Sequence, residues 1–186
     1  YDQKEWAQAA ERLERIRATD AAYEANTVTN LLYKIYYTTA SDLIAAGRLE
    51  EGIRQSERAL ALRPNDKAAL EQKQLATAYL QAMGYWQANW QKAVAAFADL
   101  YKLQPNYLDV ETRLAKAAIA YGDSQAQRGA WCDAAAQYII ALDVQPSAAL
   151  RGTPATAAVC CSCIRQRLSS GAASSVQMQP LRCCTL

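Results

Sequence analysis

Apolar and small residues recur along much of this chain at a step of 41 positions. In the two clearest copies they are Trp90, Ala93, Phe97, Leu100 and Leu103, then Trp131, Ala134, Tyr138, Ala141 and Val144. A weaker copy begins 41 positions earlier at Leu49, and another begins 43 positions before that at Trp6. The spacing within a copy is i, i+3, i+7 and i+10, which is one stripe of an α-helix. Each copy therefore predicts an amphipathic helix of about 14 residues.

A second set of helices is predicted between these copies. The stretches 31–46, 67–83 and 108–126 are rich in Ala, Leu and Tyr at helical spacing, and only Gly122 interrupts them. A proline follows each of the last three amphipathic helices, where it ends one hairpin and starts the next. The predicted organisation is a repeat domain over 1–147, with a half repeat at 1–23 and repeats at about 31–66, 67–107 and 108–147, followed by a Ser/Ala/Cys-rich basic tail at 148–186.

Small residues recur where two helices of a hairpin would cross closely. Two copies carry them with a turn glycine and a closing proline: Ala40, Gly47, Gly52, Ser56, Ala59 and Pro64, then Gly122, Gly129, Ala134, Tyr138, Ala141 and Pro146. This pattern resembles the tetratricopeptide repeat over residues 1–147. The resemblance implies an all-α fold, a right-handed α-solenoid of helix-turn-helix repeats. Because the period exceeds the family's ~34 residues, we expect longer first helices.

The resemblance also implies a binding groove on the inner face of the first helices. The positions that match this face are Lys34, Tyr37, Ser41, Leu75, Ala78, Ala82, Lys116, Ile119 and Asp123. This set is apolar and aromatic with scattered charge, so it favours a hydrophobic or helical protein partner over an acidic C-terminal peptide.

Aromatic residues are interpreted mainly as structural. Trp6, Trp90 and Trp131 recur at one repeat position, which predicts buried anchors, whereas Trp86 lies off the register and is expected to be more exposed. The chain has 11 Tyr and one Phe. Tyr33, Tyr36 and Tyr37 crowd one helix, so we expect some of their hydroxyls to face a groove or an interface.

Nothing in the sequence indicates catalysis. The chain has no histidine, which removes the commonest general base and zinc ligand. Paired carboxylates such as Glu50 and Glu51 fall at predicted helix starts, where negative charge is favoured by the helix dipole. No phosphate-binding loop or nucleophile motif is present. We therefore predict no enzyme activity, no catalytic residue and no cofactor.

Six cysteines are candidate metal ligands or disulfide partners. Cys132 is predicted to be a buried apolar residue. The tail cysteines, at 160, 161, 163, 183 and 184, lack paired CxxC spacing, so no metal site is predicted. Disulfides are favoured if the chain is exported. The tail cysteines and the start at Tyr1 without Met favour an extracellular or cell-surface location, with a cytoplasmic one as the alternative.

The distribution of charged and apolar residues limits the classes of partner that the sequence predicts. Residues 1–143 hold 16 Lys/Arg and 18 Asp/Glu, and residues 144–186 hold four Arg and no acid. The basic tail lacks the clustered Lys/Arg and interleaved aromatics of a nucleic-acid surface, so nucleic acid is not predicted as a partner. No apolar run approaches the ~20 residues of a membrane span.

Three interpretations of the tail stay open: a flexible or modified Ser/Thr segment, the product of a different reading frame, or an atypical helix that closes the repeats. Residues 155–168 can form a helix in the place of a fourth first helix, whereas residues 6–17 match a second helix whose first helix is missing. Such open ends favour head-to-tail association into a homo-oligomeric ring or filament. The predicted contact is Trp6, Leu13, Ile16, Val159, Ile164 and Leu168.

The predicted function is thus a non-catalytic protein–protein interaction scaffold that associates with itself. The alternative is a peptide- or protein-binding adaptor, or the sensor module of a larger protein. The competing explanation for the open ends is that they mark only where the chain was cut.

Overall fold

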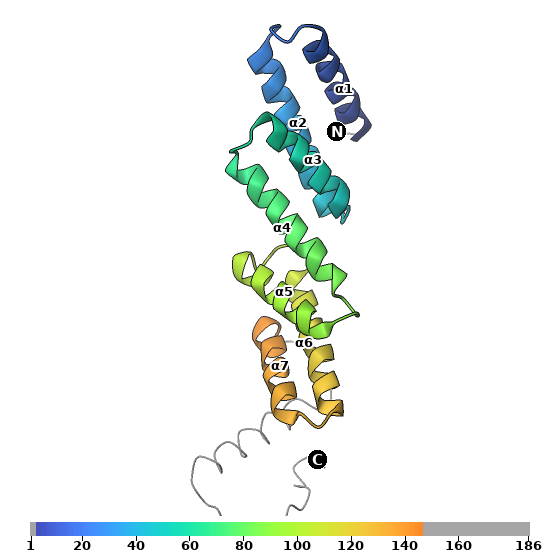
Figure 1. Cartoon of the computed structure of the whole chain (residues 1–186), viewed down its shortest axis with the longest axis vertical. Helices are drawn as coiled ribbons and strands as arrows, with labels where there is room; N and C mark the ends of the chain where they lie inside the picture. The colour runs from blue at the N-terminus through green and yellow to red at the C-terminus, as the bar shows by residue number, and fades with distance from the viewer. Residues whose placement is uncertain (1–2, 147–186) are drawn as a thin grey trace, which may run out of the picture. The chain divides into compact units, whose positions relative to one another are not determined.

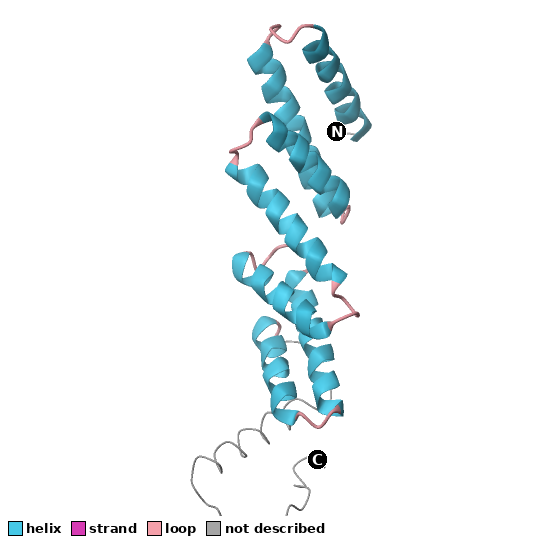
Figure 2. Cartoon of the chain, in the orientation of Figure 1, coloured by secondary structure: helices cyan, strands magenta, loops and turns pink. Residues whose placement is uncertain are grey.

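The chain is all-α over the residues that the computed structural model describes, 3–146 (Figures 1 and 2). Seven helices follow one another there. Their bounds are α1 Gln3–Thr19, α2 Ala25–Ala45, α3 Leu49–Leu62, α4 Lys67–Gly84, α5 Trp90–Leu103, α6 Val110–Gln127 and α7 Trp131–Val144. The all-helical prediction is confirmed. A right-handed solenoid remains a prediction.

The helices belong to two compact units. Unit 1 is Tyr1–Gln81 and holds α1, α2, α3 and most of α4, and unit 2 is Ala82–Leu186 and holds α5, α6 and α7. Within unit 1, α2 packs against both α1 and α3, and within unit 2, α6 packs against both α5 and α7. The boundary falls inside α4, so the repeat predicted at 67–107 is divided between the two units.

The predicted period is confirmed by the bounds of the second helices. α3, α5 and α7 each contain 14 residues, and their first residues are 41 positions apart. A proline follows the C-cap residue of each one. Their shared buried positions also align, as Gly52, Ala93 and Ala134, then Ser56, Phe97 and Tyr138, then Ala59, Leu100 and Ala141.

The first helices are longer than the second ones. α2 has 21 residues, and α4 and α6 have 18 each. α4 and α6 match the predicted ranges within two residues, whereas α2 begins six residues before the predicted start at 31. The added turns of α2 contain Val28, which is buried in the core of unit 1. This apolar contact gives the extra turns a packing partner that the sequence pattern did not reveal.

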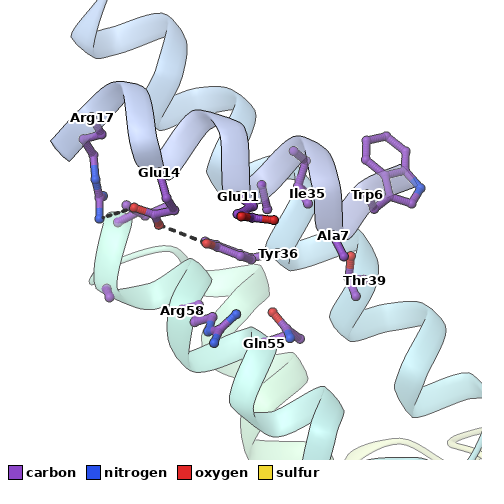
Figure 3. A pocket seen from close by; sticks show the side chains of 13 residues that line it. Trp6, Ala7, Glu11, Glu14, Arg17, Ile35, Tyr36, Thr39, Gln55 and Arg58 are labelled. Atoms are coloured by element: carbon purple, nitrogen blue, oxygen red, sulfur yellow. Dashed lines mark hydrogen bonds and ion pairs between the residues drawn. The ribbon is translucent and has the colours of Figure 1, made fainter. Parts of the chain in front are cut away.

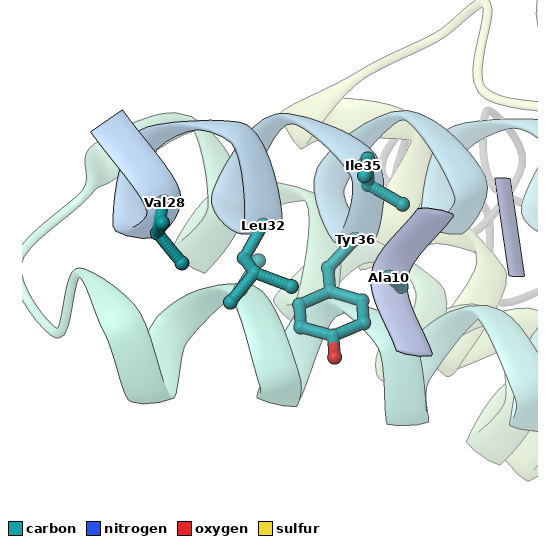
Figure 4. Close-up of a cluster of buried hydrophobic side chains, with 6 residues drawn as sticks. Ala10, Val28, Leu32, Ile35 and Tyr36 are labelled. Carbon is teal, nitrogen blue, oxygen red and sulfur yellow. The ribbon is translucent and has the colours of Figure 1, made fainter. Parts of the chain in front are cut away.

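The core of unit 1 lies where α2 meets α1 and α3. Leu32 and Ile35 are buried there with Ala10 of α1 (Figure 4). Trp6 and Leu13 of α1 are partly buried and pack against this cluster. Because α1 contributes mostly small or partly exposed side chains, its contact with α2 is less extensive than the contact between α2 and α3.

Two glycines mark close helix crossings. A Cβ added at Gly52 would lie 2.6 Å from Cγ1 of Ile44, and one at Gly122 would lie 2.6 Å from Cε1 of Tyr138. Real Cβ atoms are not found at such distances, so each position accommodates no side chain without movement of its neighbour. The prediction of a small residue at a hairpin crossing is confirmed at Gly122, and Gly52 lies at a similar crossing, at the register position of Ala93 and Ala134.

Two of the three hairpin turns share one geometry. Gly47 and Gly129 adopt φ values of 79° and 77°, and in each turn the next residue donates its N–H to a carbonyl five residues back. This is the Schellman arrangement, in which glycine takes the left-handed conformation at no steric cost. The turn between α4 and α5 differs, because a non-glycine residue, Gln87, has the positive φ there, of 64°.

The tryptophans are not equivalent. Trp6 and Trp90 are partly buried, but Trp131 is 44% exposed, so the prediction of a buried anchor is wrong for Trp131. Trp86, which was expected to be more exposed, is partly buried. Its ring makes an edge contact with Phe97 at 6.0 Å, and the Arg113 guanidinium lies 4.8 Å from the ring centroid. Trp86 is therefore a structural residue of unit 2.

Candidate functional site: a cleft between α1 and α3

A cleft of about 600 Å³ opens in unit 1 between α1 and α3, and α2 contributes to its wall (Figure 3). It is lined by Trp6, Ala7, Ala10, Glu11, Glu14 and Arg17 of α1, by Ile35, Tyr36 and Thr39 of α2, and by Gln55, Arg58, Ala61 and Leu62 of α3. The lining is part apolar and part charged. This mixture is typical of a site that recognises a protein segment by its shape and its charge together.

Tyr36 links the helices at the centre of the cleft. Its hydroxyl donates a hydrogen bond to Oε1 of Glu14 at 2.9 Å, and Arg17 pairs with the other oxygen of Glu14 at 2.8 Å. Burial of the Tyr36 ring and its hydrogen bond to Glu14 raise the pKa of the phenol. Both carboxylate oxygens of Glu14 are thus occupied within the protein.

Arg58 has no such carboxylate partner. Its guanidinium lies 5.6 Å from the centroid of the Tyr36 ring, which orients it toward the cleft. It forms no ion pair or hydrogen bond with any residue between 3 and 146. Gln55 stands one turn earlier on the same wall. The α3 wall therefore offers several hydrogen-bond donors.

The α1 wall carries the opposite charge. Glu11 has only a long pair with Arg15, at 3.6 Å, and both side chains are 70% exposed. A pair this exposed contributes little to stability. With Glu14 neutralised by Arg17, the charges that remain available are Glu11 on α1 and Arg58 on α3, so the cleft is polarised between its two walls.

The repeat register shows which cleft residues the fold does not require. Helices α1, α2 and α3 correspond to α5, α6 and α7 at offsets of 84, 82 and 82 positions. At these offsets, the charged or phenolic residues Glu11, Glu14, Tyr36 and Arg58 correspond to Ala95, Ala98, Ala118 and Ile140. A comparison of the aligned copies by charge, rather than by their apolar stripes, singles out these four positions. That comparison could have indicated the cleft from the sequence.

None of the nine predicted groove residues lines this cleft. Lys34, Tyr37, Ser41, Leu75 and Ala78 lie in unit 1, and Ala82, Lys116, Ile119 and Asp123 lie in unit 2. Several already have structural roles. Leu75 and Ala82 are buried, Ser41 accepts a hydrogen bond from Gln72, and Asp123 accepts one from the Tyr138 hydroxyl at 2.7 Å. The predicted groove thus remains a prediction.

The predicted end-to-end contact is only partly within the described residues. Trp6 lines the cleft, Leu13 packs against the unit 1 core, and Ile16 is 38% exposed. Val159, Ile164 and Leu168 lie outside the residues that the structure describes.

Cys132 differs from its prediction. Its side chain is exposed on α7 and is disulfide-bonded, so the expectation of a buried apolar cysteine is wrong. The other five cysteines fall beyond residue 146 and are not described.

Two further findings concern residues 3–146. No group of three or more His, Cys, Asp or Glu side chains there is arranged to hold a metal ion. No helix in the same range has the length and apolar character needed to cross a bilayer.

Comparison with known proteins identifies no relative: no protein-family model, no curated protein and no solved structure matches the chain. The interpretation of the cleft and of the exposed helix faces therefore depends on their geometry and chemistry.

Proposed function

We propose that the chain is a non-catalytic protein–protein interaction scaffold of tetratricopeptide-like hairpins, which stacks head to tail on copies of itself. The supporting observation is an apolar face of α1 that lacks the cover its counterpart has. Ile16 of α1 corresponds to Leu100 of α5, and Ile16 is 38% exposed whereas Leu100 is 1% exposed. The same register position is closed by packing in one unit and open in the other.

The outer face of α7 is also apolar and exposed. On α3, Glu57 pairs with Lys73 of the following helix at 2.9 Å, so this face of a second helix meets the next first helix. The residue at the same register position of α7 is Ile139, which is 48% exposed. Leu142, three residues further, is 39% exposed. An apolar face of this kind on a helix favours association.

In the proposed assembly, the exposed face of α7 of one copy is turned toward the open face of α1 of the next copy. The predicted contact residues Val159, Ile164 and Leu168 lie outside the described residues. Such a contact uses different surfaces on the two partners, so it forms a ring when it closes and a filament when it does not.

Sedimentation equilibrium over a range of concentrations tests this proposal. We expect the mass of the wild-type chain to rise with concentration and the Ile16→Asp variant to stay monomeric, because a carboxylate would be buried in the contact. Leu103→Asp is the matched control, since Leu103 is 75% exposed and lies on neither stacking face. A wild-type chain that is strictly monomeric at high micromolar concentration refutes the assembly, and electron micrographs distinguish rings from filaments.

A further inference from the structure

We propose that the cleft between α1 and α3 binds an acidic segment of a partner protein, with a carboxylate side chain on Arg58 and an adjacent bulky apolar side chain against Trp6 and Ile35. The cleft and the predicted stacking contact share Trp6, but Arg58 belongs to the cleft alone, so variants of Arg58 test this inference separately from head-to-tail stacking.

The charged side chains of the cleft and the hydroxyl of Tyr36 are not required for packing of the repeat. Their counterparts in α5, α6 and α7 are three alanines and an isoleucine, and those helices pack together with these small or apolar residues. Glu14, the partly buried charge of this set, adds a desolvation cost that packing alone does not require. The charged and phenolic residues occur in helices α1, α2 and α3 and not at the corresponding positions of α5, α6 and α7. A binding role of the first three helices accounts for this difference.

The charges of the cleft residues determine the charge of the ligand group that binds there. Arg17 and Tyr36 occupy both oxygens of Glu14, so this carboxylate does not compensate Arg58. The Tyr36 ring holds the Arg58 guanidinium at 5.6 Å from its centroid. A pre-oriented guanidinium is suited to two parallel hydrogen bonds with a carboxylate, and Gln55 adds a donor one turn away.

The other residues that line the cleft determine which side chain of the ligand lies beside its carboxylate. Trp6 is partly buried, Ile35 is buried, and Ala7 and Ala10 are small, so apolar surface lies beside the charged walls. A volume of about 600 Å³ lies in the range of sites for a few side chains. Glu11, on the opposite wall, disfavours a ligand carboxylate near α1 and therefore directs it toward Arg58.

Selection from a phage library of random peptides, each of roughly 12 residues and so able to form about three helical turns, tests the proposal. The wild-type chain is expected to enrich peptides that carry Asp or Glu within one turn of Trp, Phe or Leu. Enriched peptides without an acidic preference, or no enriched peptide at all, would overturn it.

Fluorescence anisotropy with one enriched peptide then locates the site. We expect Arg58→Glu to weaken binding by about tenfold or more, as loss of a charge-assisted contact predicts, and the same variant to bind a peptide whose acid is replaced by Lys. Arg12→Glu makes the same charge change at an exposed residue of α1 outside the cleft, and it should bind like the wild type.

Three results contradict the inference. Equal loss in both variants would show a general charge effect, and unchanged binding by Arg58→Glu would place the peptide elsewhere. A changed sedimentation mass for Arg58→Glu would assign the cleft to contact between copies. Circular dichroism melting of each variant confirms folding, which the exposed position of Arg58 should leave intact.

Discussion

Replacing Gly122 by alanine tests whether the fold depends on close approach of α6 and α7. The added Cβ would lie 2.6 Å from Cε1, 2.9 Å from Cδ1 and 3.1 Å from Cζ of Tyr138. Ordinary contacts begin at 3.4 Å, so the ring must retreat by about 0.8 Å (3.4 minus 2.6). The ring is 2% exposed, and its hydroxyl is held by Asp123, so this movement strains packed surroundings.

The two effects of this substitution oppose each other. Overpacking of this kind typically costs about 1–3 kcal/mol, and the higher helix propensity of alanine returns about 1 kcal/mol. We expect Gly122→Ala to lower the free energy of unfolding by about 1–2 kcal/mol, because a buried aromatic ring has less freedom to move than the end of a flexible chain.

Urea unfolding followed by circular dichroism measures the change, and Gly84→Ala is the matched control. Gly84 lies in α4 with no atom within 4 Å of an added Cβ and no positive φ, so its alanine variant should equal or exceed the wild type in stability. In a double-mutant cycle, Tyr138→Leu should remove most of the penalty at Gly122. Equal stability of Gly122→Ala and Gly84→Ala would refute the close crossing.

Three other predictions follow from local geometry. Gly129→Ala should cost about 1 kcal/mol through its φ of 77° alone, since nothing lies near an added Cβ, and chemical denaturation should show Gly129→Asn to be milder. Trp86→Ala should lower the stability of unit 2 by about 2–4 kcal/mol in the same assay, because the ring fills space beside Phe97 and carries the Arg113 guanidinium; a loss below that of an ordinary surface substitution would contradict this role. Burial, followed by a hydrogen bond with Asp66, raises the pKa of Tyr33 from 10.0 to about 12, so its contribution to stability is complete below pH 10 and is lost as the pH rises through about 12. Thermal melting between these pH values should therefore show a shallower decline for Tyr33→Phe than for the wild type, and parallel declines would show that Tyr33 does not contribute.

Much of the helical architecture was readable from the apolar stripe. The starts of α3, α5 and α7 follow from Leu49, Trp90 and Trp131, because an amphipathic helix of this length is specified by local spacing and by the proline after it. The turn glycines were readable for the same reason, since only a residue without a Cβ adopts a positive φ freely. The early start of α2 was missed, because Val28 has its partner on another helix.

The cleft was not found from the sequence, because its residues come from three helices and belong to no single periodic stripe. Glu14 and Arg58 read as solvent-exposed charges on separate helices, and only the packing of α1 and α3 around Tyr36 brings them to one opening. Trp131 shows the converse, since its repeat position predicted burial but its neighbours leave it 44% exposed.

The sequence by itself determined the helices, the period of their repeat and the glycines of the two Schellman turns, because these depend on interactions between residues close along the chain. Only the tertiary structure decided which side chains are covered, which charges are already paired and where a cleft opens. Those properties depend on distances between separate helices, and a periodic pattern specifies the face of a helix without specifying what lies against it.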